Sequence, residues 1–273
     1  ISGVNGELIN FGQFWNRRGL IARRKEIEAF TARKQLAYAS AYGYLAAAQE
    51  MKHIAENVSS KQIEKNILNV TIESMLDEIQ EEYGSRGIVG TTTHTFATAV
   101  TSNGIYGGVE DVIGVEAENY SFYVFQAPRW INIGNEMSYI GERLLRNGFD
   151  VKLCCCGFDG SAVEHVIVPE IKCAFVTANE HHGIDNVQPV CKYFIESMYE
   201  RNLSLDERDL LIQCRLKFDE LMIKAQYALK DALDVHKRME ECYIESMNFK
   251  ELDMYCSGIL ENIQSIISES GSV

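Results

Sequence analysis

The chain has 273 residues, of which 39 are acidic and 26 basic, and its formal net charge is −13 at pH 7. This acidic balance argues against a nucleic-acid partner, because nucleic acids are held by Lys and Arg at their phosphates. No apolar stretch reaches the roughly 18 residues of a membrane span, and no secretory signal precedes the first predicted helix. We therefore expect a cytoplasmic protein with no membrane partner and with its eight cysteines reduced.

The first part of the chain has the apolar spacing of helices. Apolar residues three and four apart predict a long helix over residues 13–57 and, after a polar break, a shorter helix over 60–82. Basic residues cluster near the start of the long helix. We interpret them as a solvated face that pairs with Glu26 and Glu28, the alternative being a surface that docks on an acidic partner or nucleic acid. The basic residues are Arg17, Arg18, Arg23, Arg24 and Lys25.

Residues 88–180 have the order of strands and helix that is typical of an α/β domain. An apolar strand at Ser121–Phe125 is followed by a helix at Met137–Arg146. Further strands are predicted at Asp150–Cys156 and Lys172–Ala178. This order predicts a mostly parallel sheet covered by helices, and any phosphate site would lie at the turn between the first strand and the helix.

That turn, residues 126–135, lacks the groups that a phosphate-binding loop needs. Such a loop reads G-x-x-x-x-G-K-[ST], because glycines let backbone amides approach the phosphates, the lysine reaches the terminal phosphates and the hydroxyl holds magnesium. In an ungapped alignment, the residues at the glycine, glycine, lysine and hydroxyl positions are Ala127, Asn132, Ile133 and Gly134. We interpret the segment as an ordinary strand-to-helix turn, the alternative being that Arg129 is a substitute phosphate contact.

Two blocks, residues 94–104 and 147–170, resemble an uncharacterised bacterial family of tandem P-loop ATPase-like proteins. The resemblance implies a P-loop NTPase-like fold, a glycine-rich loop in each half, and ATP and Mg as ligands of the intact protein. It also implies an acidic residue at the end of the strand that follows Pro169-Glu170, where this chain has Thr177, and it matches His182 to a family histidine. Because the phosphate and metal positions depart from the family pattern, we expect no cofactor in this chain.

Polar residues after the second predicted strand are the best remaining candidates for a ligand-binding cleft. Asp159, Glu164, His165 and Glu170 are expected in a loop near the carboxyl edge of the sheet, where α/β proteins place ligands. The alternative is structural: Asp159 and Ser161 turn the loop, and Glu170 meets a backbone amide.

Histidines give weaker candidates. His94 is either a satisfied side chain at a strand edge or a group that faces the site. His181 and His182 are metal-ligand candidates together with Cys156 or Asp159, but no standard zinc spacing is present, so no metal site is predicted.

The chain contains an internal repeat with an offset of 184 residues. An apolar seam in the first long helix maps onto a second predicted helix over 203–245, and the shorter helix maps onto one over 249–269. Each copy is therefore predicted as a helical hairpin, with small alanines in the seam that favour close, coiled-coil-like packing. We interpret the seams as packing between the hairpins; the alternatives are a groove for an outside partner and a homo-oligomer formed through the hairpins. The first seam is Ala37, Ala41, Tyr44, Ala48, Met51, Ala55 and Val58, and the second is Leu221, Ala225, Ala228, Ala232, Val235, Met239 and Cys242.

The repeat also sets the predicted domain organisation. The first-copy counterpart of the turn at 127 would lie 184 residues earlier, before Ile1, so the chain holds about one and a half copies. We expect residues 1–86 to be the helical tail of a first repeat, 87–188 to be the degenerate P-loop domain and 189–273 to be the second hairpin. The hypothesis is that the missing N-terminal α/β half is an upstream partner in the intact protein and carries any working phosphate loop.

Two functions remain open from the sequence. The first is a non-hydrolysing ATPase-like module that is the regulatory or assembly half beside an active upstream half. The second is an enzyme, ATPase or kinase-like, that binds a nucleotide or another phosphorylated ligand through an altered site around Arg129, His94, Asp159 and His182. Loss of the lysine and the magnesium hydroxyl favours the first, because phosphoryl transfer depends on their electrostatic stabilisation.

Overall fold

The computed structural model describes residues 9–59, 65–128, 130–180, 184, 188–195 and 203–270. The chain forms two compact units, one from residues 1–39 and 230–273 and the other from residues 40–229. Two long helices, α2 (Arg24–Ser59) and α6 (Leu205–Ile244), contribute residues to both units. The short helices η1 (Phe11–Phe14) and α1 (Arg17–Ala22) precede α2, so the first predicted helix is three helical segments.

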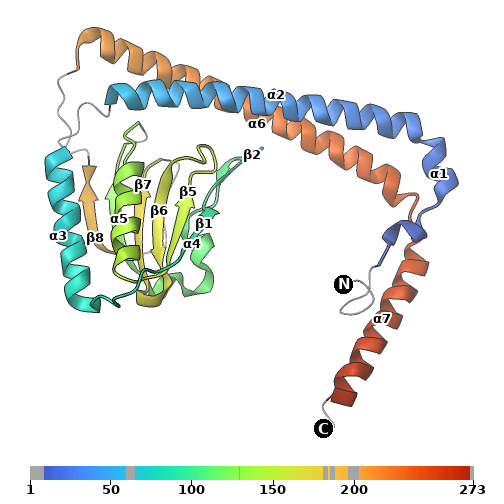
Figure 1. Ribbon diagram of the computed structural model, residues 1–273. Helices are drawn as coiled ribbons and strands as arrows, with labels where there is room; N and C mark the ends of the chain where they lie inside the picture. Colours follow the sequence, from blue (N-terminus) through green and yellow to red (C-terminus); the bar gives the residue numbers. More distant parts are fainter. Residues whose placement is uncertain are drawn as a thin grey trace. The chain divides into compact units, whose positions relative to one another are not determined.

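The described part of the larger unit contains a six-stranded, mostly parallel sheet with the strand order β1-β5-β6-β7-β4-β8 (Figure 1). Strand β6 is antiparallel to both of its neighbours, whereas the other pairs are parallel. The strands are β1 (Thr92–Phe96), β4 (Ser121–Gln126), β5 (Val151–Cys155), β6 (Val163–Val168), β7 (Cys173–Ala178) and β8 (Pro189–Phe194). The short strands β2 (Ala99–Thr101) and β3 (Gly104–Tyr106) form a separate antiparallel hairpin.

Helices cover both faces of the sheet. On one face, α5 (Gly134–Arg146) and α3 (Lys65–Tyr83) bury their apolar side chains together with strand residues such as Phe125 and Phe175. Figure 1 shows α3 beside α5 and β8. On the other face, α4 (Val109–Ile113) packs through Val109 against side chains that include Phe122. The predicted α/β class is therefore confirmed.

The sequence-based prediction of the sheet was right for β4, α5, β5 and β7, and wrong about the segment between β5 and β7. That segment was expected to be a loop, but it contains β6, which makes antiparallel hairpins on both sides. Glu164 and His165 interrupt the apolar pattern of this strand, which explains why it was missed. The sheet also extends past the predicted domain end at residue 188, because β8 pairs with β4.

The long helices α2 and α6 run antiparallel and contact each other within each unit. In the smaller unit, Arg33 and Asp231 form an ion pair with a 2.6 Å N–O distance. In the larger unit, Ala48 packs with Phe218 and Met222. The seam residues of both helices are buried or half-buried, as predicted. The predicted hairpins are not confirmed, because the packing partner found for α3 is α5, and α2 packs against α6.

The smaller unit also contains α7 (Phe249–Ser270), whose first turns pack against η1. The ring of Phe14 lies 5.5 Å from that of Tyr255, between centroids. The predicted solvated face of α2 is confirmed, since Arg24 pairs with Glu28 at 2.7 Å and Arg23 with Glu26 at 3.8 Å. Within the described residues, every helix is too short or too polar to cross a bilayer.

Candidate functional site

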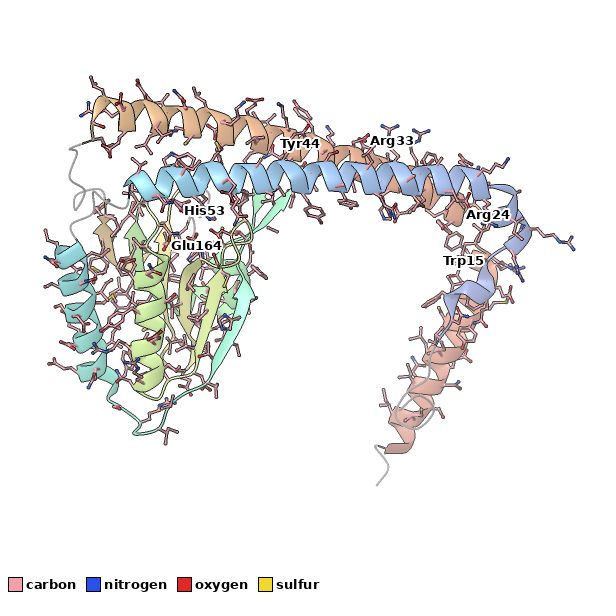
Figure 2. All side chains as sticks on the ribbon, turned by 45° about the horizontal axis from the view of Figure 1, so that its top comes forward. Trp15, Arg24, Arg33, Tyr44, His53 and Glu164 are labelled. Atoms are coloured by element: carbon pink, nitrogen blue, oxygen red, sulfur yellow. The ribbon has the colours of Figure 1, made fainter. Side chains whose placement is uncertain are left out.

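A small cavity of about 40 Å³ lies at the carboxyl edge of the parallel strands, in the larger unit. It is enclosed by the last turns of α2, the β4–α5 turn, the start of β6, the end of β7 and Phe218 of α6. Figure 2 labels His53 of α2 and Glu164 of β6 at this edge. The volume is large enough to hold water, since one water molecule needs about 10–15 Å³ of such space. The polar residues that line it are Lys52, Glu56, Thr98, Asn132, Cys156, Glu164, Thr177 and Asn179.

The β4–α5 turn is filled by its own apolar side chains. Ala127, Ile131 and Ile133 are between 2% and 7% exposed and belong to the core that α5 shares with the sheet. Ile133 stands at the position where a phosphate loop has its lysine, so an apolar side chain pointing into the core takes the place of the cation. Arg129, the proposed substitute phosphate contact, lies outside the described residues.

The first backbone N–H of α5 already has an acceptor from the protein. The backbone N–H of Gly134 donates to Asn132 Oδ1 at 2.7 Å, and Asn132 Nδ2 donates to Glu56 Oε2 at 3.4 Å. A helix amino end attracts anions because its backbone N–H groups and dipole point outward. Here the anion beside that end is the carboxylate of Glu56 from α2.

Lys52 and Glu56 lie one turn apart on α2 and form an ion pair with a 2.7 Å N–O distance. Their side chains are only 12% and 8% exposed, so this pair is shielded from water. Burial works to lower the pKa of Lys52, but the neighbouring Glu56 and Glu164 carboxylates outweigh it and the pKa is raised. Lys52 therefore stays an ammonium. The sequence analysis missed both residues, although they continue the line of the buried Ala48 along α2.

Asp159 is held by the loop between β5 and β6. Its Oδ1 accepts from the Ser161 hydroxyl at 2.7 Å and from the Ser161 backbone N–H at 3.2 Å, and its Oδ2 lies 2.9 Å from His53 Nε2. Burial works to raise the pKa of Asp159, but hydrogen bonds from His53 and Ser161, together with the Lys52 charge, lower it overall. The structural interpretation of Asp159 and Ser161 is confirmed, and Asp159 also joins the Lys52 cluster at 4.0 Å.

Glu164 of β6 is the residue with the most perturbed acidity in this cluster. Burial is the main cause that raises the pKa of Glu164 to about 7, and the nearby Glu56 and Asp159 carboxylates add to it while Lys52 opposes it. At neutral pH the cluster thus holds one lysine ammonium against two carboxylates and a half-protonated third. Such a charge distribution repels phosphate groups.

Thr177 stands near the end of β7, opposite Phe125 of β4, where the family resemblance implies an acidic residue. It is 3% exposed and lines the cavity. Its Oγ1 has no hydrogen-bond partner among the described residues. Thr177 therefore offers the cavity a neutral hydroxyl and not a carboxylate.

The remaining predicted site residues do not gather here. Glu170 lies at the opposite edge of the sheet, where its carboxylate accepts from the Asp150 backbone N–H at 3.3 Å and pairs with Arg86 at 2.7 Å. This is the structural role that was the alternative for Glu170, and its placement near Asp159 is wrong. His94 is exposed on the edge strand β1, and it does not line the cavity. His182, like His181, lies outside the described residues.

His165 also departs from its expected position in a loop. It lies on β6 next to Glu164 and is 1% exposed, opposite Val176 of β7. Because neighbouring residues of a strand point to opposite faces, His165 and Glu164 do not belong to one cleft.

A larger cleft of about 490 Å³ adjoins the small cavity and shares Glu56, Asn132 and Gly134 with it. Its volume falls in the range of small-molecule sites. The described residues that line it include neither Lys nor Arg, so it has no cation for a polyphosphate. Its other lining residues are His53, Asn57, Asn135, Glu136, Ser138, Ser161 and Ala162.

Comparisons with known proteins add no family assignment. A scan against protein-family models and searches of curated proteins and of solved structures each found no match. Within the part of the chain that the structure describes, no group of three or more His, Cys, Asp or Glu residues is placed to hold a metal ion. The site is therefore interpreted from its own geometry.

Proposed function

We propose that this chain is a non-hydrolysing, ATPase-like α/β module, which acts as a regulatory or assembly part beside a catalytic partner domain. The observation that carries the proposal is the position of the Glu56 carboxylate, bonded through Asn132 at the amino end of α5. This is the place where a phosphate-binding domain of this topology would receive the phosphate. A carboxylate fixed there competes with any incoming anion.

The surrounding chemistry supports the same conclusion. Phosphoryl transfer needs a cation on the terminal phosphates and a held metal ion. Ile133 is buried in the core at the lysine position, and Thr177 is a neutral residue at the acidic position. The Lys52 ammonium does not replace the missing cation, because Glu56 pairs with it at 2.7 Å.

A thermal-shift titration of the purified chain tests the proposal. Mg·ATP, Mg·GTP and inorganic phosphate are the probes, each added up to millimolar concentration. A ligand present at about 100 times its dissociation constant stabilises a protein by about 2.7 kcal/mol, which is readily measured. We expect no shift with any probe and no phosphate release from Mg·ATP. A saturable shift, or turnover that copurifies with the chain, would contradict the proposal.

The same titration examines the alternative function, in which an altered site binds a phosphorylated ligand. The size of the adjoining 490 Å³ cleft favours that alternative, while its carboxylates oppose it. If a shift is seen, Arg129→Ala and Asp159→Asn test two of the four contacts that the alternative names. A loss of the shift in either variant establishes a ligand site, and an unchanged shift places the ligand elsewhere.

A further inference from the structure

Helix α7 carries an apolar stripe whose counterpart in the other repeat copy is a buried interface. In α3, five sheet-facing residues are at most 2% exposed and pack against α5 and the sheet. They are Leu68, Ile72, Met75, Leu76 and Ile79. The residues 184 positions later on α7 are Leu252, Cys256, Ile259, Leu260 and Ile263. Only two of the five residue types differ, so the chemistry of the two stripes is nearly the same.

The α7 stripe is more exposed than the α3 stripe, since Leu252 and Ile259 are half-buried while Cys256, Leu260 and Ile263 are exposed. Leu260 is 60% and Ile263 is 47% exposed, and Ile266 and Ile267, one turn further, are 62% and 65% exposed. Large aliphatic side chains aligned along one face of a 22-residue helix are typical of a face that packs against another protein surface. In α3 the corresponding stripe is buried against α5 and the sheet of the α/β domain.

From this correspondence we infer that the α7 stripe is a docking surface for a further α/β domain of the same kind, one whose helix equivalent to α5 meets α7 as α5 meets α3. The α3 interface is the internal template for the contact. It consists of apolar side chains from α5, among them Ile140 and Leu144, with an ionic border in which Arg143 bonds Glu73. The inference rests on the repeat and not on the proposed loss of hydrolysis.

The polar side of α7 makes a membrane surface a poorer occupant. The exposed residues there include Glu251, Asp253 and Glu261, which anionic lipids repel.

Two measurements test the inference together. The first asks whether the stripe is covered in the native protein. Cys256 lies within the stripe and is exposed, whereas the other seven cysteines are buried or half-buried. Maleimide labelling of Cys256, followed by mass spectrometry, is compared between the purified 273-residue chain and the native product in fresh extract of its own cells. We expect labelling to be at least about tenfold slower in the native product and equal in both samples after unfolding in urea.

The second measurement asks what kind of surface the stripe fits. Residues 66–80 of α3 are replaced in the full chain by residues 250–264 of α7, with Glu73 kept because it bonds Arg143 and Tyr139. We expect the sheet domain to fold with a Tm loss of no more than about 10 °C, since each kcal/mol shifts a domain of this size by about 2–4 °C. The control graft carries Asp at positions 76 and 79 and should lose at least about twice as much.

Each outcome decides the inference. Protection of Cys256 together with a folded graft supports it. Equal labelling of Cys256 in the two samples would show that nothing covers the stripe. A graft that loses as much Tm as its control would show that the stripe does not fit an α/β domain. Protection of Cys256 that appears in the purified chain as its concentration rises would assign the stripe to a second copy of the chain. Equal labelling, a graft as unstable as its control, and concentration-dependent protection would each overturn the inference.

Discussion

Removing the buried Lys52 ammonium should destabilise the larger unit more than most single surface substitutions. In Lys52→Met the aliphatic length is kept, but Glu56 and Asp159 lose their ammonium partner, and Glu164 loses the charge that opposes its pKa shift. The Lys52 and Glu56 side chains are 12% and 8% exposed, so solvent screens this loss only weakly. Removing one partner of a buried ion pair costs about 3–5 kcal/mol. We expect a loss in that range at pH 8.

The double substitution Lys52→Met/Glu56→Gln isolates the interaction. A glutamine at position 56 still offers an oxygen to Asn132, as Glu56 does now. Since the unpaired Glu56 carboxylate is then gone, the double variant should recover about 2 kcal/mol or more of the single variant's loss. Together with Glu56→Gln alone, the two variants complete a double-mutant cycle that gives the coupling energy. The single variant's loss should also shrink at pH 5, where Glu164 is protonated in the folded state.

The assay is urea unfolding followed by tryptophan fluorescence in a Trp15→Phe background. Trp130 is then the only tryptophan, and its ring meets Phe218 edge-on at 5.3 Å in the same unit as the charge cluster. Lys217→Met, which removes an exposed ion pair with Glu220 on α6 in the same unit, is the matched control. A Lys52→Met variant whose unfolding free energy stays within about 0.5 kcal/mol of the parent at pH 8 would refute the argument that the buried Lys52 ammonium stabilises the neighbouring carboxylates.

Three further predictions follow from the same geometry. Because the pKa of Glu164 is raised from 4.5 to about 7, the folded chain holds a proton that the unfolded chain releases in this pH range, so its stability should fall by about 3 kcal/mol as pH rises from 4.5 to 7. The fall should be absent in Glu164→Gln. Parallel pH profiles of the two proteins in urea unfolding would contradict the prediction. Gly141→Ala should cost about 1–3 kcal/mol of stability, since the added methyl would lie 2.8 Å from Leu153 Cδ2. Gly43→Ala on α2, where nothing lies within 4 Å of the added methyl, should stabilise by about 0.5–1 kcal/mol. Thermal unfolding of both variants checks the opposite signs. Leu76→Ala should cost about 2–5 kcal/mol of stability, because Leu76 is only 2% exposed. In the purified chain Leu260→Ala, at the position 184 residues later, should cost less than about 0.5 kcal/mol, because Leu260 is 60% exposed. Equal losses would mean that the apolar stripe of α7 is already buried in the purified chain.

The sequence by itself determined the local elements with strong periodicity. Helical spacing gave α5, α6 and α7 within a few residues, because an amphipathic pattern depends only on side chains that are near in the chain. The apolar runs gave β4, β5 and β7 for the same reason. The absence of a phosphate loop was also readable, since that motif is contiguous from 127 to 134. The correspondence of apolar positions at an offset of 184 residues was read from the sequence, and the tandem repeat inferred from it stays a prediction.

Only the tertiary structure decided which distant residues meet. Lys52 and Asp159 are more than one hundred positions apart and come together because α2 lies over the carboxyl edge of the sheet. Glu170 was expected beside Asp159, but the antiparallel strand β6 carries the chain to the other edge before Glu170 is reached. Whether an apolar stripe is buried, as on α3, or exposed, as on α7, is likewise set by the surface available to it, because burial is a property of the partner and not of the stripe.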